Sequence, residues 1–170
     1  MNISACRGPK TYDFLKNTKK QKCPDVFGDP ALLLKELYTP KKIEHLTNKI
    51  GIVPHKSNYK HYKNLNLPSN YHIINPRDLW SNVVNQIYSC KTIISSSLHG
   101  LIISDTYSKP NIMLYEIKLN EGTFKFTDYY ESQKRPFIYI NNINEYDEKL
   151  LYCQGNKIDL NTLKNAFPFK

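Results

Sequence analysis

The stretch TIISSSLHGL, residues 92–101, joins a short apolar strand to a helix. Its first residues are β-branched, as expected of a buried strand. Three serines follow, and one histidine, His99, comes two residues after the last of them. A serine at such a junction can cap the helix, and the free amide groups of the first helical turn favour an anion. Such a junction suits an anion, and His99 would stand in the first turn of the helix.

Strands and helices alternate along the chain from residue 49 onward. We predict strands at residues 50–54, 71–75, 92–95, 111–115 and 137–140, and helices at residues 58–65, 76–88, 98–108, 125–133 and 160–166. This alternation predicts an α/β fold, Rossmann-like, with a parallel sheet covered by helices on both faces. In such sheets ligands bind beyond the carboxyl ends of the strands, where residues 95–100 lie.

The predicted helix at residues 76–88 begins with a proline. Pro76 suits the first helical position, because the amide hydrogen that it lacks would have no partner there. Leu79 and Ile87 belong to a set of apolar residues at helical spacing. We therefore expect the face that carries them to lie on the sheet.

The part of the chain before residue 49 has a less regular pattern. We expect the end of a strand at residues 3–6, a helix at 10–17, a short strand near Val26, and a linker or covering helix at 35–49. A chain of 170 residues is long enough for one domain and an additional piece.

The chain is basic, with 24 Lys and Arg against 15 Asp and Glu, a formal charge of +9. This charge favours anionic partners. Most of the basic residues are lysines spread along the chain, without the stripe or aromatic-basic module typical of nucleic-acid binding, so we expect no nucleic-acid partner. Arginine is rare here, so Arg7, Arg77 and Arg135 are the cations to examine first.

The four cysteines lie far apart in the sequence and form no CxxC motif. We interpret them as free thiols in a reducing compartment, and we expect no metal site. No apolar run reaches the roughly 20 residues of a membrane span, and the first residues lack the apolar stretch of a signal peptide. We therefore expect the protein in the cytoplasm or at the inner face of the membrane.

Two interpretations of the serine-histidine junction stay open at this point. His99 could hold a ligand, with Gly100 leaving room for that ligand to come close, or it could pack against a neighbouring loop while the serines only cap the helix. His55 ends the strand at residues 50–54 and points to the same rim of the sheet, which is a weak signal by itself.

Five stretches in sequence are together more specific than any one of them: CRGPKT, DVFGDPALLL, IGIVPH, TIISSSLHGLIISDTYSKP and KFTDYYES. In this order they resemble the polysaccharide pyruvyl transferase family, over residues 4–132. That family adds pyruvate ketals to bacterial cell-surface sugars. The resemblance implies phosphoenolpyruvate as the donor, a sugar diol or lipid-linked oligosaccharide as the acceptor, and no cofactor.

The resemblance also implies a domain organisation. Family members are usually longer and have a fold of the glycosyltransferase B (GT-B) kind, with two Rossmann-like halves facing a cleft. We expect residues 1–34 to be a remnant of the end of the N-terminal domain, 35–48 a linker, and 49–170 the C-terminal donor-binding domain. The chain would then be a fragment, a truncated product or one half of a split enzyme for cell-surface polysaccharide or exopolysaccharide biosynthesis. It would work as a homo-oligomer or with a complementary N-terminal-half partner.

The resemblance assigns roles to particular residues. His99 is implied as the general acid, a role that suits a side chain titrating near neutral pH. Phosphoenolpyruvate would be bound by Arg7, Ser96, Ser97 and Lys125, with Lys118 as a rival to Lys125 and with His55 and Gly100 as further contacts. Many relatives have an arginine two positions before the histidine, where this chain has Ser97.

Two other functions compete with pyruvyl transfer. A glycosyltransferase donor domain would hold a nucleotide sugar and use an acidic residue for the ribose, for which Glu116 is the candidate. A non-catalytic interaction subunit would instead expose an apolar patch around residues 32–34.

Overall fold

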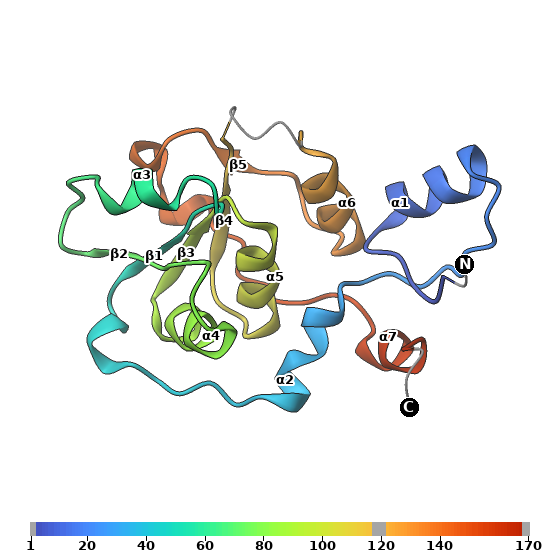
Figure 1. Ribbon diagram of the computed structural model, residues 1–170, viewed down its shortest axis with the longest axis horizontal. Coiled ribbons are helices and arrows are strands. Elements are labelled where there is room, and N and C mark those ends of the chain that lie inside the picture. The colour runs from blue at the N-terminus through green and yellow to red at the C-terminus, as the bar shows by residue number, and fades with distance from the viewer. Residues whose placement is uncertain (1–2, 117–121, 168–170) are drawn as a thin grey trace.

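A five-stranded parallel sheet forms the centre of the chain (Figure 1). The computed structural model describes residues 3–116 and 122–167. In sequence order the strands are β1 (Ile50–Val53), β2 (Tyr71–Ile73), β3 (Thr92–Ser95), β4 (Asn111–Leu114) and β5 (Tyr139–Ile140), and in space they follow the order β2-β1-β3-β4-β5. The predicted α/β fold with a parallel sheet is therefore confirmed. The larger GT-B arrangement stays a prediction.

Helices cover both faces of the sheet. The α-helices are α1 (Pro9–Asp13), α2 (Leu34–Leu37), α3 (Tyr59–Lys63), α4 (Trp80–Ser89), α5 (Leu98–Thr106), α6 (Phe124–Ser132) and α7 (Leu160–Asn165). A π-helical turn at Phe14–Thr18 continues α1, and 3₁₀ turns occur at Pro30–Leu33, Glu44–Leu46, Ile143–Glu145 and Glu148–Leu150.

Neighbouring residues of β3 show how the strands divide the core into two sides. Ile93 packs in one cluster with Val84 and Ile87 of α4, while Ile94 packs in another with Tyr62 of α3. Successive side chains of a strand point to opposite faces, so an uninterrupted apolar run indicates a sheet buried on both sides. Residues 92–95, two isoleucines between a threonine and a serine, are all buried for this reason.

The strand order places a topological switch point between β1 and β3. The chain leaves β1 for β2 on one side, and β3 pairs with β1 on the other side, with Val53 opposite Ser95. In open parallel sheets the crevice at such a point is the preferred place for a ligand. The segments that follow β1 and β3, with His55 and His99, begin there.

The start of α4 differs from the prediction. We expected Pro76 at the first helical position, but α4 begins at Trp80. The Asn75 carbonyl oxygen accepts from the amide of Asp78 at 3.2 Å, and the Asn75 side chain accepts from the amide of Arg77 at 3.1 Å. These bonds close a turn before the helix. Leu79 therefore lies outside the helix and is 69% exposed instead of packing on the sheet.

The N-terminal segments pack beside the sheet rather than forming a separate body among the described residues. Cys6 and Phe27 form a parallel bridge, and Leu32 is 1% exposed in the cluster that contains Leu98 and Leu101 of α5. Figure 1 shows this region next to α5, α6 and α7. The division into remnant, linker and donor domain stays a prediction.

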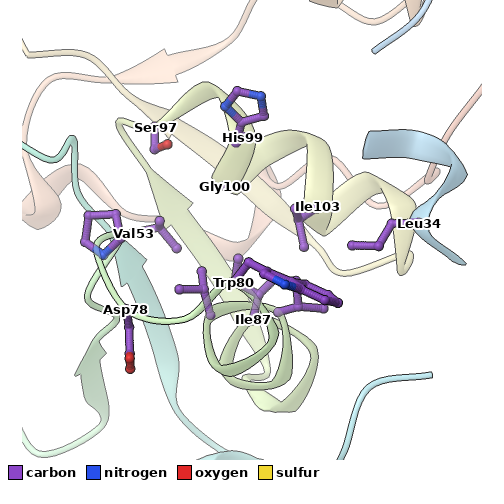
Figure 2. A pocket seen from close by; sticks show the side chains of 12 residues that line it. Leu34, Val53, Asp78, Trp80, Ile87, Ser97, His99, Gly100 and Ile103 are labelled. Carbon is purple, nitrogen blue, oxygen red and sulfur yellow. The ribbon is translucent and has the colours of Figure 1, made fainter. Parts of the chain in front are cut away.

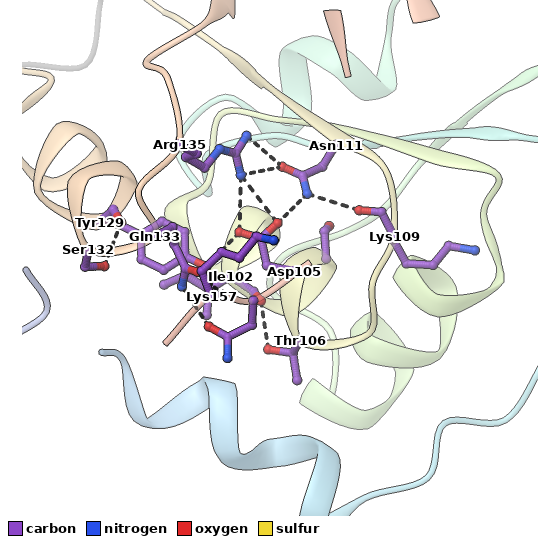
Figure 3. Close-up of polar contacts among 12 residues, drawn as sticks. Ile102, Asp105, Thr106, Lys109, Asn111, Tyr129, Ser132, Gln133, Arg135 and Lys157 are labelled. Carbon is purple, nitrogen blue, oxygen red and sulfur yellow. Dashed lines mark hydrogen bonds and ion pairs between the residues drawn. The ribbon is translucent and has the colours of Figure 1, made fainter. Parts of the chain in front are cut away.

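A buried ion pair joins α5 to the segment after α6 (Figure 3). Arg135 Nη1 lies 3.2 Å from Asp105 Oδ2, and both side chains are at most 2% exposed. Tyr129 of α6 donates to the same oxygen at 2.7 Å, and Asn111 of β4 donates to the other at 2.7 Å. Burial raises the pKa of the Asp105 carboxyl, and the Arg135 guanidinium opposes that rise. The Arg135 guanidinium also lies 4.0 Å from the centre of the Tyr130 ring.

We predict that Arg135→Met lowers the free energy of unfolding by about 3–5 kcal/mol, because it leaves the Asp105 carboxyl buried without its cation. Arg77→Met, at an exposed position, serves as the control and is expected to change it by less than about 0.5 kcal/mol. Urea unfolding followed by circular dichroism measures both. Equal stability of the two variants would contradict the structural role of the ion pair.

Candidate functional site

Three side chains from distant parts of the sequence meet at the switch-point edge of the sheet. The Arg7 Nε atom lies 3.5 Å from Asp29 Oδ2, and the His99 Nε2 atom lies 4.0 Å from the same oxygen. Asp29 is 11% exposed, Arg7 35% and His99 70%. The structure therefore brings together two of the predicted residues, Arg7 and His99. It does so through a carboxylate that we did not predict as part of the site.

Asp29 is held by the turn that it begins. Its Oδ1 atom accepts from the amide of Ala31 at 3.0 Å and so caps the 3₁₀ turn at Pro30–Leu33. Gly28 precedes it with φ of 136°, a conformation that favours glycine. Oδ2 is left to face Arg7 and His99. The sequence signal for this capped turn is the tripeptide of a glycine, a capping aspartate and a proline at residues 28–30.

Arg7 is positioned by α6. The Thr11 amide donates to Asp128 Oδ1 at 3.0 Å, and the Thr11 hydroxyl donates to Asp128 Oδ2 at 2.6 Å. A Cβ atom on Gly8 would lie 2.0 Å from the Asp128 carbonyl oxygen, so only glycine allows this approach. The CRGPKT stretch thus docks on the KFTDYYES stretch, and Asp128, which we did not predict, fixes the turn after Arg7.

The serines before His99 shape the start of α5. Ser97 is the N-cap residue, but its side chain makes no capping bond; its amide donates to Ser95 Oγ at 3.1 Å. A Cβ atom on Gly100 would lie 2.3 Å from Ser95 Oγ and 3.0 Å from a Val53 methyl group. Glycine is therefore needed so that the first turn of α5 can pack over the ends of β1 and β3. This packing accounts for the glycine without a ligand. The predicted role of Gly100 in leaving room for a ligand stays a prediction.

Ser96 lies beneath the rim of the site. Its buried hydroxyl accepts from the His55 amide at 2.8 Å and donates to Glu116 Oε1 at 2.5 Å. The other oxygen of Glu116 accepts from the Asn58 side chain. The His55 ring is hydrogen-bonded to Ser57 Oγ at 2.8 Å. Ser96 therefore ties the ends of β1, β3 and β4 together, and both Glu116 oxygens are engaged within the protein.

Lys125 lies in the first turn of α6, one turn before Asp128. Its Nζ atom is 5.4 Å from the centre of the Phe126 ring, and the side chain is half-buried. Its predicted role at the phosphate stays a prediction. Lys118, the rival, lies outside the described residues.

A cavity of about 300 Å³ lies beside His99, between α4 and α5 (Figure 2). Trp80, Val84 and Ile87 form much of its apolar wall. Ser97, His99 and Asp78 border it as polar residues. Figure 2 shows His99 at one edge and the Trp80 ring across from it. The site therefore combines a charged edge with an apolar hollow.

Two kinds of feature are absent from residues 3–116 and 122–167. No helix in these ranges is long and apolar enough to cross a membrane. No three His, Cys, Asp or Glu side chains in them gather where they could hold a metal ion.

The fold and the site define a Rossmann-like α/β domain with an arginine, a carboxylate and a histidine at its switch point. The sequence profile of the family described as polysaccharide pyruvyl transferase matches residues 2–116. The chain belongs to the polysaccharide pyruvyl transferase family, as the resemblance implied. The matched region contains Arg7, Asp29 and His99, whereas KFTDYYES lies beyond it.

A curated relative extends the comparison beyond residue 116. The chain is 29% identical over 171 residues to "Uncharacterized protein L143" of Acanthamoeba polyphaga mimivirus, and the match covers 95% of this chain and 56% of the relative. The chain thus spans about half the length of the curated relative it matches. No solved structure matches the chain.

We predict that Asp128→Ala loosens α1 and the turn that carries Arg7. Loss of two hydrogen bonds at the start of α1 should cost about 1–2 kcal/mol and speed hydrogen exchange at the Thr11 amide. Glu131→Ala, also on α6, removes only the exposed pair with Lys10 and is the control. Amide exchange measured by NMR tests both variants. Unchanged exchange at Thr11 in Asp128→Ala would show that the Thr11–Asp128 hydrogen bonds do not hold α1.

Proposed function

We propose that this chain is the donor-binding half of a polysaccharide pyruvyl transferase and that phosphoenolpyruvate binds between Arg7 and the first turn of α5. The observation that carries the proposal is the meeting of Arg7 and His99 on the Asp29 carboxylate at the switch point. Each of the three residues comes from a different family-like stretch of the sequence, although they lie side by side in space.

The cationic groups of the site suit a small dianion. The Arg7 Nε atom is buried and has no hydrogen-bond partner among the described residues, because the contact with Asp29 at 3.5 Å is loose. A guanidinium can hold a carboxylate or phosphate in bidentate fashion. The first-turn amides of α5 add donors that have no partner within the helix. In this proposal Ser97 and Lys125 complete the donor site.

In this proposal His99 transfers the proton. Its ring is largely exposed, and its Nε2 atom lies 4.0 Å from the Asp29 carboxylate, which attracts the protonated ring without a hydrogen bond. In our mechanism His99 protonates the methylene carbon of the enol phosphate, which gives an oxocarbenium-like centre. The first sugar hydroxyl then attacks this centre, and phosphate leaves with the bonding electrons and the proton of that hydroxyl, so that an oxocarbenium-like centre forms again. The second hydroxyl attacks this centre and gives its proton back to His99. A positioned acid contributes typically ~10²–10⁴-fold.

In this proposal the acceptor binds in the cavity beside His99. The cavity next to His99 is bordered by Trp80 and Asp78. Trp80 is 59% exposed. An aromatic face and a carboxylate are suited to a sugar ring and its hydroxyls. We propose that the acceptor diol, free or lipid-linked, lies over Trp80. A second copy of the chain or a complementary N-terminal half would close the cleft, in the cytoplasm or at the inner face of the membrane.

The competing functions receive less support from the geometry. Glu116, the candidate for a ribose in a nucleotide-sugar site, has both oxygens bonded to Ser96 and Asn58. Leu32, at the centre of the apolar patch expected of an interaction subunit, is buried in the core. The donor-binding proposal needs neither feature.

Titration of phosphoenolpyruvate by calorimetry tests the donor site. Arg7→Ala should weaken binding at least about tenfold, since a charge-assisted bond to the ligand is lost. The control is Arg77→Ala, which replaces an exposed arginine. No heat from the unaltered chain at millimolar phosphoenolpyruvate would overturn the proposal. Heat from a uridine diphosphate sugar instead would favour the glycosyltransferase alternative.

Deuterium incorporation into the methylene group of phosphoenolpyruvate tests His99 without requiring the acceptor. In heavy water, reversible protonation by His99 should exchange these hydrogens, and His99→Ala should slow the exchange by about 10²-fold or more. His61→Ala, which replaces an exposed histidine of α3, should leave the rate unchanged. Proton NMR of the methylene signals gives the rate, and full exchange in His99→Ala would show that another group is the acid.

A further inference from the structure

Two cysteines lie against each other directly behind Arg7. The Sγ atoms of Cys6 and Cys23 are 2.9 Å apart, although 17 positions separate the residues in the sequence. Both are free thiols, as are the buried Cys90 and the exposed Cys153. The sequence alone, with no CxxC motif, did not predict this contact.

The backbone around Cys6 is fixed, whereas Cys23 lies in a loop. The Cys6 amide donates to the Val26 carbonyl at 2.9 Å, and the Cys6 carbonyl accepts from the Gly28 amide at 2.9 Å. Cys23 belongs to a stretch without helix or strand. The sulfur atoms need to approach by only about 1 Å to reach the bond length of a disulfide, about 2.05 Å. A small movement of the Cys23 loop achieves this while the bridge at Cys6 persists.

The two thiols differ in how a reagent can reach them. Cys6 is 5% exposed, and burial together with the Cys23 neighbour raises its pKa to about 12, so it is shielded and protonated at neutral pH. Cys23 is half-buried and is the thiol that an oxidant in solution can reach. Cys6 is then the partner that resolves the oxidised form.

We propose that Cys6 and Cys23 form a redox-modification site, in which a peroxide converts the two thiols into an intramolecular disulfide. The Cys23 thiol takes one oxygen from hydrogen peroxide and becomes a sulfenic acid, and water is released. The Cys6 thiol then attacks the Cys23 sulfur, the sulfur–sulfur bond forms, and a second water leaves. Overall, two thiols and one peroxide give one disulfide and two waters, and a thiol reductant reverses the change.

The disulfide would act on the N-terminal arm, residues 6–29, which carries Arg7 and Asp29. It closes the loop over residues 6–23, which contains α1, and joins the segment before Arg7 covalently to the segment that leads to Asp29. Oxidation therefore locks Arg7 and Asp29 in their observed arrangement. Its effect on phosphoenolpyruvate rests on the proposed function, whereas the formation of the disulfide does not.

Hydrogen peroxide added to the full chain with Cys153→Ser tests the site. We expect the intact mass to fall by two hydrogens, a non-reduced peptide map to link Cys6 with Cys23, and dithiothreitol to restore the mass. The melting temperature should rise by roughly 5–10 °C, as expected for a loop of this length. A peroxide-treated chain without this mass loss, or with Cys90 in the cross-link, would overturn the proposal.

Two single variants separate the roles of the thiols. In Cys6→Ser the Cys23 sulfenic acid should accumulate and react with dimedone, whereas in Cys23→Ser the shielded Cys6 should stay unmodified. Dimedone labelling of Cys6 in the second variant would show that burial does not protect it and would overturn the assigned order.

Calorimetry with phosphoenolpyruvate on the reduced and oxidised chain distinguishes this proposal from the proposed function. We expect the oxidised chain to bind at least as tightly as the reduced chain, because the arm is preorganised. A disulfide without any binding leaves the redox site standing and removes the donor-site proposal. Binding without a disulfide does the reverse.

Discussion

The geometry of the candidate site depends on the buried pair of Asp105 and Arg135. Asp105 lies near the end of α5, and Arg135 follows α6, so their contact at 3.2 Å fixes these two helices against each other and against β4. The amino-terminal end of α5 carries His99, and α6 carries the carboxylate that holds the turn after Arg7. A shift of α5 relative to α6 would therefore separate His99 from Arg7.

Carboxylates organise the site at two further levels. Asp128 positions the backbone after Arg7, and Asp29 faces the Arg7 and His99 side chains. Ser96 and Glu116 join the ends of three strands below them. Carboxylates thus hold the site at different depths: Asp29 borders the open site, while Asp128 is fully buried. The exposed histidine rests on this polar framework.

The sequence predicted the sheet well and the contacts of the site only in part. Residues 92–95 were predicted correctly because a short run of β-branched residues between polar neighbours is typical of a buried strand. His99 became a candidate because it follows that strand. The start of α4 was wrong because the side chain of Asn75 closes a turn, an interaction that apolar spacing does not reveal. Asp128 was missed because its partner Thr11 is 117 positions away. No local pattern reports such a contact.

The helix α1 and the π-helical turn after it contain no buried residues. Their attachment therefore depends on a few polar bonds rather than on apolar area removed from water. A segment held in this way opens with a smaller free energy than the whole domain, as a separate cooperative unit. Arg7 stands at the junction between this segment and the backbone at Cys6, which two hydrogen bonds of 2.9 Å hold. Local opening of α1 would therefore free one side of the Arg7 backbone while the sheet stays folded.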